Sequence, residues 1–301
     1  MSKITKLGLG IVSFEGNEHI KNITYELRDL CDVIVVCLQD KSYQGTPIDP
    51  DDVAEVMNLK EHGFIDDVIW FTSARKLTND KESPRLIELD KRNFILDYLE
   101  KTCTCSHSMV IDSDEFYDKN DFAAAKKAIS DSKDIHVTYC RYVNYYRDYC
   151  HTIVWSIDTY VPFITESSYR FSFYEGAFKG AADLTRRYKI DGKDGNTTYA
   201  ILNYQTVKMH HLSWIRINIE KKVDSWSAQK YFDYKTLRMR VLDRYYNFKD
   251  GQNAIIMINT PENSLVISKL PKQYIHPRFR LDEKITKDID EYRSLDNGNK
   301  Q

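Results

Sequence analysis

A short apolar run ends in three acidic side chains in the segment Met109-Val110-Ile111-Asp112-Ser113-Asp114-Glu115-Phe116. This pattern predicts a buried strand whose carboxyl end brings negative charge to the edge of an α/β sheet, where open sheets bind their ligands. Carboxylates this close together repel one another unless a cation lies among them. Mg²⁺ or Mn²⁺, bound by one or two carboxylates and by substrate phosphates, meets that need. The segment therefore predicts a metal–diphosphate site, and the alternative is a strand that ends in a solvated acidic loop.

Strands and helices alternate along the chain before this segment. Continuous apolar or β-branched runs predict buried strands at residues 7–14, 31–38, 67–71 and 106–111. Helices are predicted by one-sided apolar spacing or helix-favouring composition at residues 17–30, 51–62 and 88–101. This alternation predicts a doubly wound α/β layer.

The second half of the chain has a different character. Aromatic-rich, strand-like runs occupy residues 136–143, 152–155, 160–164 and 170–173, and a further strand is expected within residues 205–214. Residues 218–246 alternate charged and aromatic side chains, as an amphipathic helical region does. The charged tail is expected to fray from about residue 288. We therefore expect a core domain over residues 1–220 and a C-terminal helical extension over residues 221–301 that packs on it.

Composition limits the class of protein. The 301 residues can bury a substantial core, and no run of about 18 apolar residues exists, so we expect no stable membrane insertion. The amino terminus lacks the apolar core of a signal peptide. The six cysteines follow neither a disulfide-scaffold spacing nor a zinc spacing. These features predict a cytoplasmic protein with reduced thiols.

Charge is distributed unevenly, although the net charge is only −2. Residues 1–135 hold 26 acidic and 17 basic side chains, whereas residues 170–250 hold 9 acidic and 16 basic ones. An acidic, metal-binding half beside a basic half suits a polyanionic ligand held between them. The basic half also leaves room for a nucleic-acid surface.

Five segments of the chain form an ordered pattern. They are Leu9-Gly10-Ile11-Val12-Ser13-Phe14 with Glu15 and Asn17, Asp32-Val33-Ile34-Val35-Val36, Lys91-Arg92-Asn93, Asp112-Ser113-Asp114-Glu115-Phe116, and Met209-His210-His211-Leu212-Ser213-Trp214-Ile215-Arg216. In order and spacing they resemble segments of glycosyltransferases of the GT-A fold, especially family 2 and related viral and phage enzymes. The counterparts are the nucleotide-binding first strand, the second strand beside the base, an Arg-Asn pair that opens a helix, the DxD motif and a later histidine segment. The resemblance extends over roughly residues 5–220. It implies a GT-A (Rossmann-like) fold, with a mixed, mostly parallel sheet flanked by helices and a C-terminal helical extension.

The resemblance implies roles for the acidic and histidine segments. Transfer from a nucleotide sugar puts negative charge on the departing diphosphate, which a divalent cation neutralises as a Lewis acid. Asp114 is expected to bind Mn²⁺ or Mg²⁺ directly, Asp112 to meet the ribose or reach the metal through water, and Glu115 to orient its neighbours. A histidine ligand suits Mn²⁺ better than Mg²⁺. Alternation along a strand turns only one of His210 and His211 toward the cleft, and the choice stays open. The alternative is one buried polar histidine and one surface histidine.

A further set of residues is expected to contact the nucleotide or its phosphates. They are Phe14, Glu15, Gln39, Lys91, Arg92 and Arg216. Arginine suits bidentate contact with phosphate. The alternatives are a solvated helix start for Lys91 and Arg92 and a surface salt bridge for Arg216.

An inverting transferase needs a general base within hydrogen-bond reach of the acceptor hydroxyl. Glu166, Glu175 and Asp183 lie in the appropriate half of the chain, and Glu175 and Asp183 are the catalytic candidates beside Asp114. The Glu-Asp pair that many family 2 enzymes show there is missing. Both the base and the stereochemistry, inverting or retaining, therefore stay open.

The sequence thus predicts a metal-dependent glycosyltransferase that moves a sugar from a nucleotide-diphosphate sugar to an acceptor hydroxyl. The acceptor is a glycan or a modified DNA base, such as a hydroxymethylated base of phage DNA that is flipped out of the duplex. The abundance of Lys, Asp and Tyr suggests a viral chain, which would act in the host cytoplasm. The alternative is a catalytically silent module that binds carbohydrate or nucleic acid on the same scaffold. A nucleotidyltransferase is disfavoured, because Glu15-Gly16-Asn17-Glu18 is acidic where that class has a Gly-rich basic loop.

Overall fold

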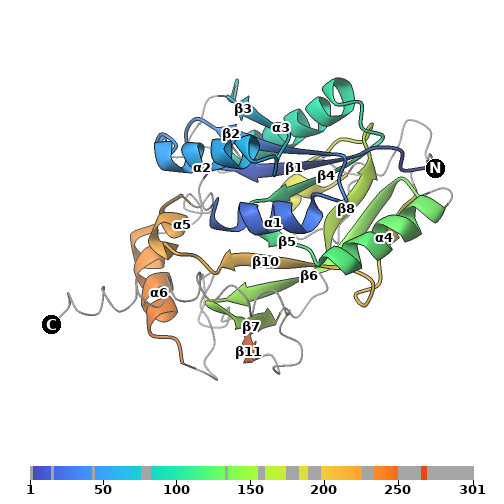
Figure 1. Cartoon of the computed structure of the whole chain (residues 1–301). Helices are drawn as coiled ribbons and strands as arrows, with labels where there is room; N and C mark the ends of the chain where they lie inside the picture. The colour runs from blue at the N-terminus through green and yellow to red at the C-terminus, as the bar shows by residue number, and fades with distance from the viewer. Residues whose placement is uncertain are drawn as a thin grey trace. The chain divides into compact units, whose positions relative to one another are not determined.

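Figure 1 shows the helices and strands of the computed structural model. The chain divides into two compact units. The first comprises residues 1–142 and 158–210, and the second comprises residues 143–157 and 211–301. The residues that the structure describes are 3–14, 17–42, 45–75, 83–132, 135–154, 160–173, 183–188, 198–225, 234–249 and 266–269. Two predicted site residues, Glu15 and Glu175, lie outside these ranges.

A parallel sheet forms the centre of the first unit. Its strands are β1 (Leu7–Ser13), β2 (Val33–Gln39), β3 (Asp67–Phe71) and β4 (His107–Asp112). They lie in the order β4-β1-β2-β3, and every neighbouring pair is parallel. The register sets Val12 of β1 opposite Asp112 of β4, so the ends of these two strands lie side by side.

Antiparallel strands extend this sheet beyond β4. β8 (Tyr160–Glu166) pairs antiparallel with β4, β6 (Val137–Tyr146) pairs antiparallel with β8, and β9 (Tyr199–Ile201) runs parallel to β6. A two-residue strand, β5 (Glu115–Phe116), pairs with β10 (Lys208–Trp214). The predicted α/β class is confirmed, as a sheet of mixed orientation flanked by helices.

Helical segments lie between the strands, and a capping side chain marks the start of some of them. The helical segments are η1 (Asn17–His19), α1 (Ile20–Leu27), α2 (Pro50–Glu61), α3 (Ser83–Asp97), η2 (Tyr98–Thr102), α4 (Lys119–Asp131) and η3 (Leu184–Arg186). Asp49 caps α2 by accepting from the backbone N–H of Asp51, and Pro50 follows at the first helical position. Gly63, with a φ of 73°, lies just past the end of α2, as predicted.

Helix α3 differs from its prediction in one respect that matters for the site. The sequence predicted a helix from residue 88, with Lys91 and Arg92 at its start. The structure begins α3 at Ser83, so Lys91 and Arg92 lie inside the helix, and both are buried. The alternative of a solvated helix start is therefore wrong for this pair. Pro84, which is favourable in a first helical turn, marks the earlier start.

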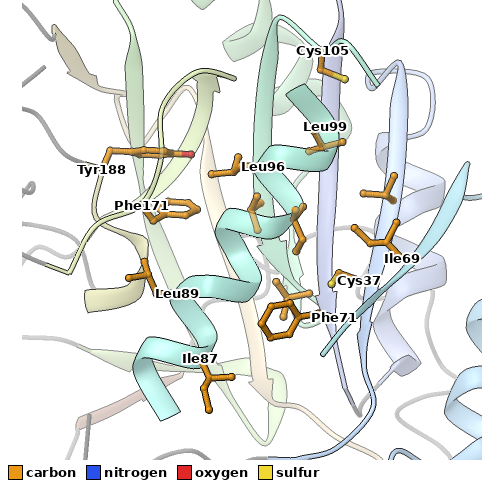
Figure 2. Close-up of a cluster of buried hydrophobic side chains, with 14 of the residues drawn as sticks. Cys37, Ile69, Phe71, Ile87, Leu89, Leu96, Leu99, Cys105, Phe171 and Tyr188 are labelled. Carbon is orange, nitrogen blue, oxygen red and sulfur yellow. The ribbon is translucent and has the colours of Figure 1, made fainter. Parts of the chain in front are cut away.

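Apolar residues of α3 and η2 pack on the parallel strands and form a buried hydrophobic cluster with them (Figure 2). Ile95, Leu96 and Leu99 of this layer are buried against the strands. On the other side of α3, the ring of Phe171 stacks on that of Tyr188 with 4.3 Å between centroids. The backbone of Phe171 is bound to Asn93 of α3 through hydrogen bonds of 2.9 and 3.1 Å. These contacts anchor the segment 183–188 beside the helix that carries Arg92.

The second unit has a smaller, aromatic core. β7 (Asp148–Val154) pairs antiparallel with the end of β6 and with β11 (Val266–Lys269). Helices α5 (Ile219–Ser225) and α6 (Tyr234–Tyr246) supply most of the remaining core residues. Tyr146 contacts the rings of Trp214, Tyr245 and Phe248 at centroid distances of 5.3–6.0 Å. The predicted helical region within residues 218–246 is therefore confirmed in its described part.

Two general features complete the description. All six cysteines are free thiols. Every helix in the described ranges is too short or too polar to cross a bilayer.

Candidate functional site

The acidic motif follows the carboxyl end of strand β4. The backbone N–H of Ser113 donates to the carbonyl of Val12 over 3.1 Å, which fixes the start of the motif against β1. The side chain of Asp112 is 29% exposed, whereas Asp114 and Glu115 are 3% and 2% exposed. The motif therefore begins at an accessible carboxylate and continues into the interior of the first unit.

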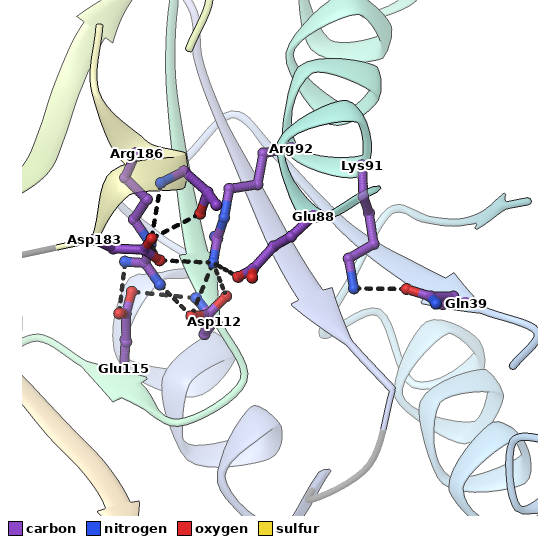
Figure 3. A network of polar contacts seen from close by, with 9 residues as sticks. Gln39, Glu88, Lys91, Arg92, Asp112, Glu115, Asp183 and Arg186 are labelled. Carbon is purple, nitrogen blue, oxygen red and sulfur yellow. Dashed lines mark hydrogen bonds and ion pairs between the residues drawn. The ribbon is translucent and has the colours of Figure 1, made fainter. Parts of the chain in front are cut away.

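Two arginines bind the carboxylate of Asp112 from different elements (Figure 3). Arg92 of α3 is fully buried, and its Nη2 lies 2.9 Å from Oδ1 of Asp112 and 2.7 Å from Oε1 of Glu88. Arg186 of η3 forms an ion pair with Oδ2 of Asp112, and its Nη1 lies 2.6 Å from Oε1 of Glu115. Burial opposes ionisation of Asp112, but the two guanidiniums outweigh burial and hold its pKa well below the ordinary value.

Asp183, one of the predicted base candidates, belongs to the same cluster. Its Oδ1 accepts hydrogen bonds from the backbone N–H and the hydroxyl of Thr185, at 2.8 and 2.9 Å, and so caps η3. Its Oδ2 lies 3.6 Å from Nε of Arg186 and 3.7 Å from Nη2 of Arg92. The side chain is 36% exposed. Asp183 and Asp112 are thus accessible carboxylates beside two buried guanidiniums.

Glu88 completes the cluster from the helix that carries Arg92. Glu88 and Arg92 have the i,i+4 spacing of a helical ion pair. Burial raises the pKa of Glu88, and the neighbouring charge of Arg92 opposes this shift. The acidic cluster is hereafter Glu88, Asp112, Glu115 and Asp183, with Arg92 and Arg186 as its cations.

Lys91 and Gln39 form a second polar contact, next to strand β2 (Figure 3). Nζ of Lys91 donates to Oε1 of Gln39 over 3.0 Å, and Nε2 of Gln39 donates to the carbonyl of Lys41 over 2.5 Å. Burial lowers the pKa of Lys91. Lys91 and Arg92 are adjacent in sequence but bind different partners. Of the residues predicted to contact the nucleotide, Gln39 and Lys91 therefore meet at the end of β2, and Arg92 belongs to the acidic cluster.

The two predicted histidines belong to different units. His210 of the first unit is 3% exposed, and its ring lies edge-on to that of Phe116 with 6.2 Å between centroids. His211 belongs to the second unit and is partly buried. Burial does not alternate here as the strand pattern predicts, because Met209 and His210 are both buried.

Three further predicted residues, Phe14, Arg216 and Glu166, are not members of the acidic cluster. Phe14 is partly buried just beyond β1. Arg216 belongs to the second unit, is 4% exposed, and donates from Nε to the carbonyl of Ser213 over 3.4 Å. Its alternative as a surface salt bridge does not agree with this burial. Glu166 pairs with His107 at the opposite end of β4 from the acidic motif.

The sequence did not single out Arg186 or Glu88. Glu88 could have been found, because it precedes Arg92 by four residues on a predicted helix. Arg186 lies 74 residues after Asp112, in a three-residue helix that has no apolar period. Only the Asp183 cap three residues earlier marks the local turn.

The donor atoms of the motif suit a hard divalent cation, since carboxylate oxygens are the ligands that Mg²⁺ and Mn²⁺ prefer. In this structure the carboxylates of the motif form ion pairs with arginines: Asp112 binds Arg92 and Arg186, and Glu115 binds Arg186. In the described ranges no group of three or more His, Cys, Asp or Glu side chains is arranged to hold a metal. The motif therefore fits such a cation by the chemistry of its donors, and binding at Asp112 would have to share or replace the contact with Arg186.

No family profile matches the chain, and no curated protein matches its sequence. A solved structure described as "Crystal Structure of a Mycobacterial Protein" aligns over 91% of this chain and 89% of that chain, at 11% identity and a TM-score of 0.37. A similarity at this level supports no conclusion about fold or function.

Proposed function

We propose that the protein is a metal-dependent glycosyltransferase that moves a sugar from a nucleotide-diphosphate sugar to an acceptor hydroxyl. The main support is that two buried arginines bind Asp112 and Glu115 at the carboxyl end of the parallel strand β4, with the buried Asp114 between these two residues in sequence. Ligands of open α/β sheets bind at that edge. A cluster that combines accessible carboxylates with guanidiniums suits a ligand made of a cation and a diphosphate.

Each part of the cluster has a separate role in this proposal. Asp114 and Asp112 hold the cation, which when bound neutralises the charge of the leaving diphosphate. Arg92 keeps the carboxylate of Asp112 ionised and oriented, because its Nη2 lies 2.9 Å from Oδ1. Asp183 is partly exposed beside the cluster and is the candidate to accept the proton of the acceptor hydroxyl.

The nucleotide and the acceptor complete the proposal. Gln39 and Lys91 form a buried polar contact at the end of β2, and they are the candidates to orient the nucleotide. The acceptor is a glycan or a hydroxymethylated DNA base, as the sequence predicts.

The test is a panel of nucleotide sugars, each added with Mn²⁺ while thermal unfolding is followed. A true donor raises the midpoint, since binding at 100 times Kd adds about 2.7 kcal/mol to the free energy of unfolding. Asp114→Asn should keep the ligand-free midpoint but lose this shift and all turnover. Asp90→Asn, at a surface ion pair with Arg75, is the matched control and should behave as wild type.

Two results would contradict the proposal. One is a panel in which no nucleotide sugar changes the midpoint. The other is turnover that continues unchanged in EDTA. Glycan or DNA binding that is insensitive to chelators, with no turnover, would favour the alternative of a silent binding module.

A further inference from the structure

Arg186 joins the acidic motif to the short helix η3 through two ion pairs. Its guanidinium contacts the carboxylates of both Asp112 and Glu115, and its side chain is only 4% exposed. Glu115 in turn accepts a hydrogen bond from the backbone N–H of Asp112 over 3.1 Å. One guanidinium thus binds two of the three carboxylates of the motif.

Neighbouring carboxylates require a positive charge among them to stay ionised together. Arg186 provides that charge in the absence of any ligand. A divalent cation at Asp112 would provide the same charge at the same oxygens. Because Arg186 binds Oδ2 of Asp112, a metal ion that took this oxygen would meet a guanidinium of like charge at contact distance, so the two compete for it.

The two arginines of the cluster differ in the length and packing of the helix that carries each of them. Arg92 lies within the fifteen-residue helix α3, is fully buried and also binds Glu88. Arg186 belongs to the three-residue helix η3, which Asp183 caps and the Phe171–Tyr188 stack anchors. A short turn yields more readily than a helix that is packed along its length. Of the two guanidiniums, that of Arg186 is therefore the one that can leave Asp112.

Building on the proposed function, we propose that Arg186 is a resident counter-cation of the acidic motif, which a divalent cation displaces, so that its guanidinium then binds the diphosphate of the donor. The exchange keeps Asp112 paired, because its carboxylate gains the cation while the guanidinium gains phosphate oxygens. Arginine suits that second partner, since its planar fork binds phosphate bidentately.

This exchange requires that cation and diphosphate bind with positive coupling. A cation that binds alone must break the ion pair between Arg186 and Asp112, and this costs binding free energy. The diphosphate offsets that cost because it binds the released guanidinium. Coupling between two ligands is reciprocal, so each should raise the affinity for the other by the same factor.

The experiment measures Mn²⁺ binding to the full chain by electron paramagnetic resonance, with and without inorganic pyrophosphate. In wild type, pyrophosphate should raise the Mn²⁺ affinity roughly tenfold, within the usual range of such coupling. Arg186→Gln should bind Mn²⁺ alone roughly fivefold or more tighter than wild type, and pyrophosphate should then add less than roughly twofold. Arg186→Lys keeps the charge but not the fork, and should fall between the two.

The control is Arg187→Gln, which removes the same charge one residue away and outside the acidic cluster. It should match wild type in both measurements, and this separates the contact of Arg186 from a general effect of net charge. Two results would overturn the inference: no coupling between Mn²⁺ and pyrophosphate in wild type, or a folded Arg186→Gln chain that binds Mn²⁺ no tighter than wild type. If Arg186→Gln does not fold, the wild-type coupling and Arg186→Lys still decide. A failed nucleotide-sugar panel with intact coupling would contradict glycosyl transfer alone.

Discussion

A Cβ atom on Gly10 of β1 would lie 2.1 Å from Cγ2 of Ile95 in α3. Gly8, two residues earlier, is similarly close to Leu99, with a Cβ distance of 2.8 Å to Cδ2. Helix α3 at Ile95 and η2 at Leu99 therefore approach strand β1 more closely than a side chain at Gly10 or Gly8 would allow. Gly10 thus sets the distance of the helix that carries Lys91 and Arg92, and Gly8 sets that of the turn that follows it.

Gly10→Ala should lower the free energy of unfolding by about 1–3 kcal/mol, because it forces an extra methyl group into a packed interface. Urea denaturation measures the loss. Ile95→Ala removes the atom in conflict, so the double variant should lose less than the sum of the two single losses. A Gly10→Ala chain as stable as wild type would show that α3 is not packed on β1 as described.

Arg92→Met should cost about 3–5 kcal/mol of the free energy of unfolding, since it removes a fully buried guanidinium from its ion pairs with Glu88 and Asp112. Arg75→Met is the matched surface control, because Arg75 pairs with Asp90 and is half-exposed. It should cost less than about 1 kcal/mol. Equal, small losses in denaturant titrations of the two variants would contradict a buried role for Arg92.

His107→Gln should weaken the pH dependence of stability between about pH 5 and 7. His107 is fully buried, with Nδ1 3.1 Å from the hydroxyl of Ser106 and Glu166 opposite on β8, and burial lowers its pKa from 6.5. The unfolded chain therefore takes up a proton at a higher pH than the folded chain does. Stability falls as pH drops below 6.5 towards the folded pKa, and above about pH 7 the group contributes nothing.

Free energies of unfolding measured at several pH values test this prediction. His62→Gln, at an exposed histidine, is the control for the loss of one imidazole. An unchanged slope in His107→Gln would show that this imidazole does not titrate differently on folding.

His210→Ala should weaken Mn²⁺ binding by about tenfold or more, whereas His211→Ala should leave it close to wild type. The reason is position: His210 is buried against Phe116, two residues after Asp114, within the unit that holds the acidic cluster. Titration of Mn²⁺ into each variant gives the comparison. Losses of equal size in both would remove histidine from the proposed cation site.

The sequence predicted much of the first unit because its signals are local. The run before Asp112 is apolar and β-branched, and it forms β4; the helix predicted over residues 51–62 is α2, Pro50–Glu61, and Gly63 follows its end. The burial of Lys91 and Arg92 was not predicted, because single charged residues on a helix are usually solvated. The contact of Arg186 with Asp112 depends on a fold that joins residues 74 apart, and no spacing rule within one element reports it.

The second unit is assembled from two stretches of chain, residues 143–157 and 211–301, and this has a consequence for synthesis in the cell. Tyr146 and Ile153 of the first stretch pack against Val241 and Tyr245 of the second. Ribosomes add about 5–20 residues per second, so the aromatic hairpin emerges seconds before the helices that cover it. A nascent chain halted before residue 241 would present this uncovered surface to chaperones, and a gene fragment that ends there would yield an aggregation-prone product.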